Sequence, residues 1–590
     1  MARGEPLGLR EPALSAPAPS GLNPSLMAQP LPSTGVQPTV SSPLRARSFG
    51  FHFWLPLFLC LAAEFAFFDL IGARRHTWIY PRWNDQIQYL TESYTGYEYL
   101  KAHGFWPGLW QTLVNPSAQG TLHDFFAVGL FSVFGPSRSA ALSVNMLALI
   151  AWQLALAAGV LRASNSRSLA WAAAALPLAL AWPWNNWAGS TADFRLDHLG
   201  MCAWGIAFAG ALATNGFRAM GWSAFFGILT GLALLTRFIT GPYFVVLYLG
   251  LAVWLAFQPD RFRRLPRLML AAAIAAGIAV PVFWLNRTWV WNYYWIGHFT
   301  GPESAIRNPN MGLAASLNFV FGGLAKNHLG PVFGWIVLAG SVLLGFGAWR
   351  ARADSPPPEK PADWWTLSCL FLFAPALVLV LHQQKSEIVV GALAPGAIGL
   401  VLALWASWYR RRSSPWPAGL FVAVVCGAAG WFFTARQFAP AYDAAFAHDA
   451  RKVNALADYV YSTSRAAGLA HPRIAVDQVT DCLDAQIMRV ICYERKKVWA
   501  PFGMTLPTGI WKEKEEVLFT RLAESDFVFI TEEGASGTWP YDEQMTALRP
   551  RTKAWCDQHL RLVERFPLFG KHMALYQRRE IPLLQNPSKK

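Results

Sequence analysis

Carboxylates and cations recur in the polar segments that separate the long apolar runs of this chain. Asp85 stands among aromatic and amide residues in YPRWNDQIQYLTESY, and Asp193 and Asp197 lie in AGSTADFRLDHL. Arg237 follows the apolar stretch GILTGLALLT, and Lys385 lies in LHQQKSEIVV. A carboxylate within hydrogen-bond reach of a hydroxyl or amine can take its proton, and a fixed cation stabilises growing negative charge. These residues are therefore the first candidates for a chemical site.

Three further residues in the same segments are weaker candidates for binding an anion: His298 in WNYYWIGH, Arg307 and His382. His298 has a simpler explanation as an aromatic neighbour at the membrane interface. For Arg237 and Lys385 the simpler explanation is that long cationic side chains extend toward lipid headgroups.

The acids have simpler explanations as well. An acid near the end of a membrane span is stable when it is hydrated among the headgroups, and this applies to Asp85. Asp193 and Asp197 are spaced i, i+4, which places both on one side of a helix with Arg195 between them. That arrangement is typical of a surface ion pair.

The composition indicates a membrane protein. Hydrophobic residues make up 54% of the 590 residues, charged residues 14%, and the mean hydropathy is +0.26. A soluble enzyme of this length would be far more polar. The net charge of +15 is explained by anchoring against anionic lipid, so we expect a lipid bilayer as partner and no nucleic acid.

Apolar runs that approach the ~20 residues needed to cross a bilayer predict eleven spans. They are 51–71, 140–161, 169–183, 198–214, 221–236, 241–257, 267–285, 330–349, 364–381, 388–409 and 415–433. The longest segment without a span is 72–139. Within it, GTLHDFFAVGLFSVFG has only about a dozen apolar residues, so this stretch is expected to lie along the membrane surface as a helix.

The basic residues predict the orientation. With a cytoplasmic N-terminus the inner segments hold fifteen Lys and Arg in forty-nine residues, whereas the much longer outer loops hold eleven. The positive-inside rule then places the C-terminus outside, because the number of spans is odd. The candidate acids and cations all fall in outer loops, which we expect to meet at one membrane face.

Both ends of the chain differ from the apolar centre. Residues 1–48 are rich in Pro, Ser and Gly and are predicted to be a disordered cytoplasmic tail; no apolar run marks a cleavable signal peptide there. Residues 434–590 are predicted to form a small α/β domain on the outer face, with short strands in RIAVD and SDFVFITEE. A Cys482–Cys492 bridge is an open alternative in that compartment.

Residues 51–433 resemble the GT-C superfamily of integral membrane glycosyltransferases. The resemblance rests on the order of features: an acid in a long first outer loop, AGSTADFRLDHL, GILTGLALLTRF and KSEIVVGALAP. The superfamily includes protein O-mannosyltransferases, the aminoarabinose transferase of lipid A and oligosaccharyltransferases. In this chain Val389 and Val390 stand where an aromatic residue would be expected after Lys385.

The resemblance implies an all-α polytopic membrane domain at 49–433, with juxtamembrane helices on the outer face. It also implies transfer of a sugar from a polyprenyl-phosphate donor to an acceptor lipid, glycan or protein at the outer face of the cytoplasmic membrane. Asp85 would be the general base, with Asp193 and Asp197 as further catalytic candidates. Arg237 and Lys385 would bind the donor phosphate.

The resemblance leaves two further points open. His298, Arg307 and His382 are weaker phosphate-binding candidates. A divalent metal such as Mg or Mn, held by Asp193 or Asp197, could replace the cations.

Two other classes of protein fit the spans. A transporter or lipid flippase would place ionisable residues near the bilayer midplane and show two related halves; no repeat relates 51–240 to 241–433. A scaffold that only anchors an outer domain would not need eleven spans. One acid does not fit the pattern, because Glu64 lies inside the first apolar run, where an ionisable group is costly.

Overall fold

The protein is described by a computed structural model. It gives the structure of residues 51–73, 84–184, 189–301, 304, 311–350, 361–408, 416–432, 444–470, 472–477, 483, 485–497, 502–504, 514–532 and 543–583. The α-helices up to residue 256 are α1 (Phe51–Phe67), α3 (Asn84–His103), α4 (Phe105–Val114), α5 (Leu122–Phe134), α6 (Arg138–Ser164), α7 (Arg167–Ala175), α8 (Leu196–Ala213), α9 (Met220–Thr236) and α10 (Thr240–Ala256). The next are α11 (Arg261–Val290), α13 (Leu313–Gly323), α14 (Pro331–Arg350), α15 (Pro361–Leu381), α16 (Ala394–Trp408) and α17 (Trp416–Phe432).

Among the residues that the structure describes, six helices are long and apolar enough to cross a membrane: Phe51–Leu70, Arg138–Ser164, Leu196–Ala213, Arg261–Thr300, Asp363–Leu381 and Ile388–Trp408. A seventh candidate is the pair Leu313–Leu329 and Pro331–Gly347, which is bent by 72°. Four shorter apolar helices, Leu122–Phe134, Met220–Thr236, Thr240–Ala256 and Trp416–Trp431, fall below that length. The length and apolar character of these helices make this a mostly helical, multi-pass membrane protein. The number of eleven spans stays a prediction.

Two expectations about the spans were wrong in detail. The run at 169–183 is not one long helix: α7 has nine residues, about 14 Å at 1.5 Å per residue, and a 3₁₀ turn that contains Pro177 follows it. The fourth outer loop, expected at 286–329, contains α13 and a π-helix at Leu324–Leu329. Its apolar residues are interrupted by Asn and Gly, which hid the helix from a hydropathy count.

The core of the bundle is built by helix pairs that are neighbours in space: α6 with α8, α9 with α11, and α15 with α16. Close packing is possible because small residues face large ones. Trp152 of α6 is fully buried, and a Cβ at Gly205 of α8 would come within 2.2 Å of its indole ring. Glu64, the unexplained acid of α1, accepts a hydrogen bond from Gln153 of α6 at 3.1 Å.

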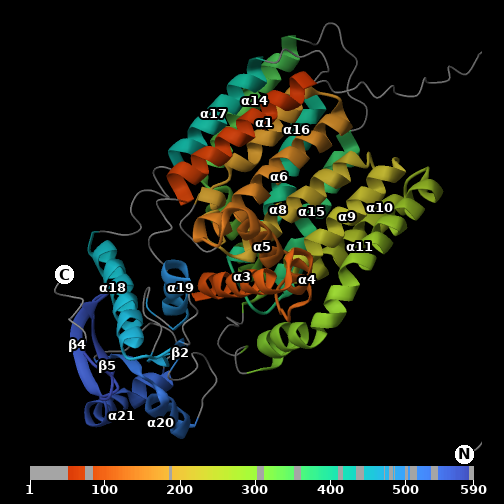
Figure 1. The fold of residues 1–590 in the computed structure, drawn as a ribbon. Coiled ribbons are helices and arrows are strands. Elements are labelled where there is room, and N and C mark those ends of the chain that lie inside the picture. The colour runs from red at the N-terminus through yellow and green to blue at the C-terminus, as the bar shows by residue number, and fades with distance from the viewer. Residues whose placement is uncertain are drawn as a thin grey trace, which may run out of the picture. The chain divides into compact units, whose positions relative to one another are not determined.

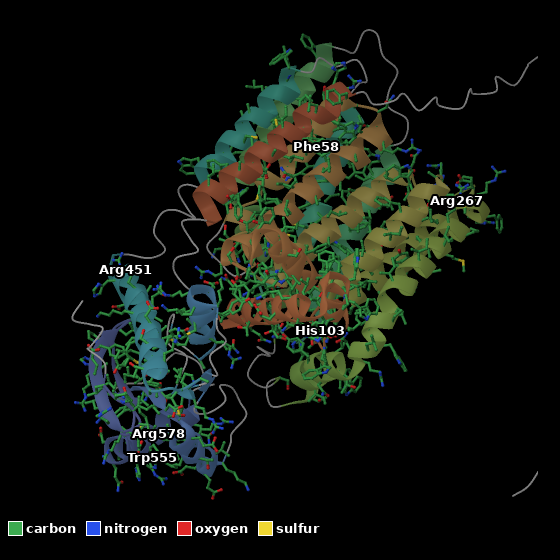
Figure 2. All side chains as sticks on the ribbon, viewed as in Figure 1. Phe58, His103, Arg267, Arg451, Trp555 and Arg578 are labelled. Atoms are coloured by element: carbon green, nitrogen blue, oxygen red, sulfur yellow. The ribbon has the colours of Figure 1, made fainter. Side chains whose placement is uncertain are left out.

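Polar contacts bring three of the expected inner segments, 215–221, 258–268 and 350–363, together at one end of the bundle. Arg218, after α8, contacts Asp260 at 3.5 Å and Asp363, at the start of α15, at 2.8 Å. Arg264 of α11 forms an ion pair with Asp260 at 2.5 Å. Helix α3 lies across the opposite end (Figure 1), and the labelled Arg267 and His103 mark the two ends (Figure 2).

The C-terminal part of the chain contains helices α18 (Ala444–Ala466), α19 (Ala485–Lys496), α20 (Glu515–Glu524) and α21 (Glu543–His559). Its strands are β1 (Ile474–Val476), β2 (Phe502–Met504), β3 (Phe527–Thr531), β4 (Arg561–Leu568) and β5 (Lys571–Gln577). The sheet order is β2-β1-β3-β5-β4; β2, β1 and β3 are parallel, and β5 is antiparallel to β3 and β4.

Strands β1 and β3 lie where RIAVD and SDFVFITEE predicted them, while the β4–β5 hairpin was not predicted. The boundaries at residues 48 and 433 stay predictions. Cys492 is a buried free thiol, which argues against the suggested bridge; Cys482 lies outside the part of the chain that the structure describes.

The gathering of the basic loops at one end predicts a defined orientation in the membrane. An accessibility tag inserted at residue 580 should react with a membrane-impermeant reagent on intact cells or spheroplasts, whereas one at residue 262 should react only after permeabilisation. Labelling after permeabilisation is the control that both tags are competent. The reverse pattern would overturn the orientation and the outer-face location of the site.

Candidate functional site

Helix α3 brings three polar side chains to one end of the bundle through its first two turns. It begins at Asn84 in NDQIQYL, with Asp85 in the first turn, where a negative charge is favourable near the helix N-terminus. Gln86 and Tyr89 are three residues apart and therefore lie on neighbouring positions of one helix face. Both are buried, at 4% and 8% exposure, while the Asp85 side chain is 64% exposed.

The first ion cluster joins α3 to the segment before α8. Arg195 contacts Asp85 at 3.0 Å and Asp193 at 3.1 Å. Gln86 donates its side-chain amide to the other oxygen of Asp193 at 2.7 Å. The backbone N–H of Gly189 also donates to the Asp193 carboxylate. Asp193 is thereby held by three partners, whereas Asp85 presents an exposed carboxylate beside a fixed guanidinium.

The second ion cluster lies at the ends of α8 and α9. Arg237 follows the last residue of α9 and pairs with Asp197 of α8 at 3.0 Å. Gln119, between α4 and α5, accepts a hydrogen bond from Arg237 at 3.5 Å and another from the Tyr89 hydroxyl of α3. Of the alternative in which Asp193 and Asp197 form a surface pair with Arg195, only the contact between Asp193 and Arg195 is present, and it is buried. Asp193 precedes the helix, and Asp197 pairs with Arg237 instead.

Backbone hydrogen bonds fix the loop that carries Gln119 against the loop that carries Arg237. The Thr121 N–H donates to Leu235 O at 2.9 Å, and the Phe238 N–H donates to Gln119 O at 2.7 Å. The approach is so close that a Cβ at Gly120 would come within 2.2 Å of Thr236 O. Only glycine fits there, so the sequence sets the distance between the two loops.

Burial and charged neighbours shift the pKa values of the clustered side chains in opposite directions. Burial raises the pKa of the Asp193 carboxyl to about 6, although Arg195 and the Gly189 N–H oppose the shift. For Arg237 burial disfavours the cation, but the Asp197 carboxylate and the neighbouring tyrosine hydroxyls together outweigh it, so the pKa of Arg237 lies above its usual value. Burial also raises the pKa of Tyr89 well above its usual value, so its hydroxyl stays protonated and donates to Gln119.

The candidates in the fourth and fifth predicted outer loops lie in a different environment. Lys385 donates to the carbonyls of Leu379, Val380 and His382 at 2.6–3.0 Å, at the C-terminal end of α15. Burial lowers the pKa of His382, which favours the neutral imidazole.

His298 is 5% exposed, with its ring 5.4 Å from that of His382. Arg307 lies outside the described residues. Their assignments stay predictions. Of the two main phosphate-binding candidates, Arg237 is connected by hydrogen bonds through Gln119 to Tyr89, one turn after Asp85. Lys385 instead caps the C-terminal end of α15.

Comparison with solved structures identifies the fold. No family model matches the chain, and no curated protein matches it by sequence. ArnT from Cupriavidus metallidurans, solved with bound undecaprenyl phosphate, superimposes with a TM-score of 0.54 at 15% identity, over 91% of this chain and 100% of that chain. The apo form of the same ArnT gives 0.54 at 14% identity, over 89% and 97%.

The chain has the GT-C fold. An oligosaccharyltransferase from Archaeoglobus fulgidus is also similar, with a TM-score of 0.41 at 12% identity over 91% of this chain and 75% of that chain. The predicted resemblance to GT-C proteins is confirmed at the level of fold.

In this GT-C fold, Asp193 and Asp197 do not fit the expected divalent metal. The Asp193 carboxylate is engaged by Gln86, Gly189 and Arg195, and Asp197 pairs with Arg237. A metal bound by both acids would have to displace two guanidinium groups. Within the described ranges no group of three or more His, Cys, Asp or Glu could hold a metal ion.

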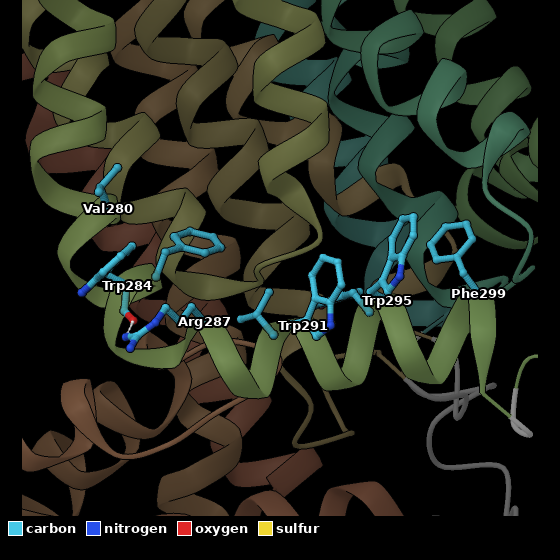
Figure 3. Close-up of a pocket in the computed structure, with 9 residues that line it drawn as sticks. Val280, Trp284, Arg287, Trp291, Trp295 and Phe299 are labelled. Carbon is cyan, nitrogen blue, oxygen red and sulfur yellow. Dashed lines mark hydrogen bonds between the residues drawn. The ribbon is translucent and has the colours of Figure 1, made fainter.

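An apolar groove of about 460 Å³ runs along the second half of α11 and the π-helix Trp291–Thr300 that follows it (Figure 3). It is lined by Val280, Phe283, Trp284, Arg287, Val290, Trp291, Tyr294, Trp295 and Phe299. Trp291 and Trp295 stack at 5.2 Å, and the Arg287 guanidinium lies 4.5 Å from the Trp284 ring. On its inner side, Tyr294 and Phe283 pack against the end of α9 next to Arg237.

Three site residues were missed by sequence reasoning: Gln86, Tyr89 and Gln119. The signal for two of them was present, because Gln86 and Tyr89 follow Asp85 at i+1 and i+4 in a helical stretch. Gln119 gave no signal, since its position is fixed by backbone pairing with a loop about 118 residues away.

The burial of Arg195 predicts that it is essential for stability. Arg195→Leu leaves Asp193 as a buried acid without its cation, which should cost about 3–5 kcal/mol. Arg473→Leu is the matched control, because Arg473 and Glu524 are 62% and 56% exposed and such pairs contribute about 0–1 kcal/mol. Thermal unfolding in detergent, followed by tryptophan fluorescence, should show a large downward shift for the first variant only. Equal shifts would contradict the paired, buried arrangement.

Proposed function

We propose that this protein is a glycosyltransferase that moves a sugar from a polyprenyl-phosphate donor to an acceptor. The observation that carries the proposal is an exposed carboxylate, Asp85, fixed at 3.0 Å from a buried arginine at the end of a GT-C bundle. The bound undecaprenyl phosphate of the similar ArnT structure supports the choice of donor class.

In the proposed reaction Asp85 is the general base. The acceptor hydroxyl or amine attacks the anomeric carbon, the bond between that carbon and the phosphate oxygen breaks, and the acceptor proton passes to the Asp85 carboxylate. Arg195 holds one oxygen of Asp85, and the 64% exposure of the side chain leaves room for the acceptor. Asp193 and Asp197, also proposed as catalytic from the sequence, act by holding Arg195 and Arg237 in place.

The leaving group is a polyprenyl phosphate whose negative charge grows as the bond breaks. Arg237 is the cation best suited to stabilise it, because it is preorganised by Asp197 and Gln119 and is only 16% exposed. Lys385, His298, Arg307 and His382 are retained as secondary phosphate-binding candidates. Lys385 would first have to release the carbonyls at the end of α15.

The apolar groove on α11 suits the polyprenyl chain of the donor. Its stacked tryptophans offer an extended hydrocarbon surface, and Arg287 is the one cation among its lining residues. Tyr294 on its wall lies close enough to Arg237 for the two to interact electrostatically. A lipid in the groove would therefore have its head group near the ion clusters.

We place the apolar helices of the bundle in the inner, cytoplasmic membrane, with residues 1–48 inside and the C-terminal α/β domain at 434–590 outside. The acceptor is a lipid, glycan or protein at that outer face. A flippase remains the alternative, in which the same donor would be moved and no sugar transferred.

The role of Asp85 predicts a selective loss of turnover. Asp85→Asn keeps the size of the side chain but removes the proton acceptor, so turnover should fall by ~10²–10⁴ while expression and donor binding stay near normal. Glu516→Gln, which changes an exposed acid of α20, is the control and should retain full turnover. Near-normal turnover in Asp85→Asn would assign the base elsewhere, first to Asp193 or Asp197.

The donor class can be tested with purified protein in detergent or vesicles. A polyprenyl-phosphate sugar should be consumed with release of polyprenyl phosphate, and a nucleotide sugar should not be consumed. Mass spectrometry of the lipid product measures both. Consumption of the nucleotide sugar would contradict the assignment, and movement of intact donor across vesicles without consumption would favour the flippase.

A further inference from the structure

A reciprocal contact joins α3, which carries Asp85, to α19 of the C-terminal region. Tyr94 of α3 donates its hydroxyl to Glu494 of α19 at 2.6 Å, and Tyr493 of α19 donates its hydroxyl to Glu98 of α3 at 2.5 Å. The two tyrosine rings lie 4.9 Å apart and are 0% and 1% exposed. Each helix thus supplies one tyrosine and one glutamate to the other.

Each of the two helices also packs against its own neighbours, α3 against α5 and α19 against α18. The contact therefore joins two helices that are each fixed in position. On the α3 side, the Tyr94 ring packs against Phe131 of α5 at 5.3 Å. On the α19 side, Arg495 and Lys496 form ion pairs with Asp458 of α18. Burial, together with the hydrogen bond to Glu98, raises the pKa of Tyr493, so its hydroxyl remains a donor at any physiological pH.

The residues of α3 that contact α19 lie on a different face of the helix from the residues that contact the transmembrane bundle. Gln86 and Tyr89 reach the ion clusters, and Ser93 donates to Asp124 of α5 at 2.6 Å. At 100° per residue, Tyr94 and Glu98 lie about a quarter turn or more from that face. Helix α3 is therefore fixed from two sides, by the bundle and by α19.

We propose that this contact positions Asp85 for catalysis, so that the C-terminal region controls the proton-accepting step through α3. Asp85 lies nine residues before Tyr94, about 14 Å along the helix axis. A helix of this length moves as a rigid rod, so a tilt at Tyr94 displaces Asp85 from Arg195. Tyr94, Glu98, Tyr493 and Glu494 are thus positioning residues, and the catalytic part of this inference rests on the proposed function.

The test uses the full-length protein in detergent with the variants Tyr94→Phe, Tyr493→Phe and their combination. Tyr459→Phe is the matched control, because Tyr459 is a buried tyrosine that donates to Gln577 within the C-terminal region at 3.1 Å. Hydrogen exchange of peptides from 84–103 reports the docking of α3 without any need for activity. Steady-state kinetics with the polyprenyl-phosphate donor report the position of Asp85.

We expect exchange in 84–103 to be roughly tenfold faster in Tyr493→Phe, in proportion to the loss of a hydrogen bond to a charged group. We also expect kcat to fall about tenfold with the donor KM within twofold. The double variant should lose less than the product of the single losses, because the four residues act as a unit. Tyr459→Phe should change neither quantity.

Unchanged exchange in 84–103, or faster exchange with unchanged kcat, would overturn the positioning role. If wild-type protein transfers no sugar from any polyprenyl-phosphate donor, the proposed function fails and the exchange measurement decides the docking alone. Faster exchange confined to the Tyr94 and Tyr493 variants would then support the contact, and equal exchange in all variants would reject it.

Discussion

Two arginines buried among carboxylates organise one end of this protein. The Arg195 and Arg237 side chains are only 7% and 16% exposed, and both are paired with acids that are 6–8% exposed, Asp193 and Asp197. Removing charges from water costs several kcal/mol for each ion, and the pair recovers this only with good geometry. The loops that carry the four residues must therefore hold fixed positions, which explains the backbone pairing at Gly120 and the docking of α3.

The three acids of the site differ in burial and therefore fall into two kinds. Asp193 and Asp197 are buried and have fixed partners, so their charges serve to hold guanidinium groups. Asp85 contacts Arg195 as well, but its side chain is 64% exposed. In the proposed transferase, only an acid of this second kind can meet an acceptor that arrives from water. In the same proposal, the buried acids keep the cations in place for the phosphate of a donor that arrives from the membrane.

Sequence predicted most of the helices and the region of the site, because hydropathy and charge report local properties of the chain. The long apolar runs became helices α6, α8 and α11, and Asp85, Asp193 and Arg237 do meet at one end. The full pairing was not predictable, since Arg195 binds Asp85 as well as Asp193, and Asp197 binds Arg237. It depends on contacts across 40 residues or more, and the roles of Gln119 and Tyr493 depend on contacts that span over a hundred and almost four hundred residues. Short or interrupted helices such as α7 and α13 were misjudged because hydropathy does not detect a proline or a bend.

In the proposed transferase, the ion clusters at the start of α3 and at the ends of α8 and α9 receive the lipid phosphate. The most direct test is photo-crosslinking with a polyprenyl phosphate that carries a diazirine on its first isoprene unit, followed by peptide mapping. We predict labelled peptides from 84–103, 189–197 and 237–240, with unlabelled polyprenyl phosphate competing. The opposite end of the bundle is also cationic, with Arg218 and Arg264 beside Asp260. Labelling there, and not at the α3 end, would contradict the account.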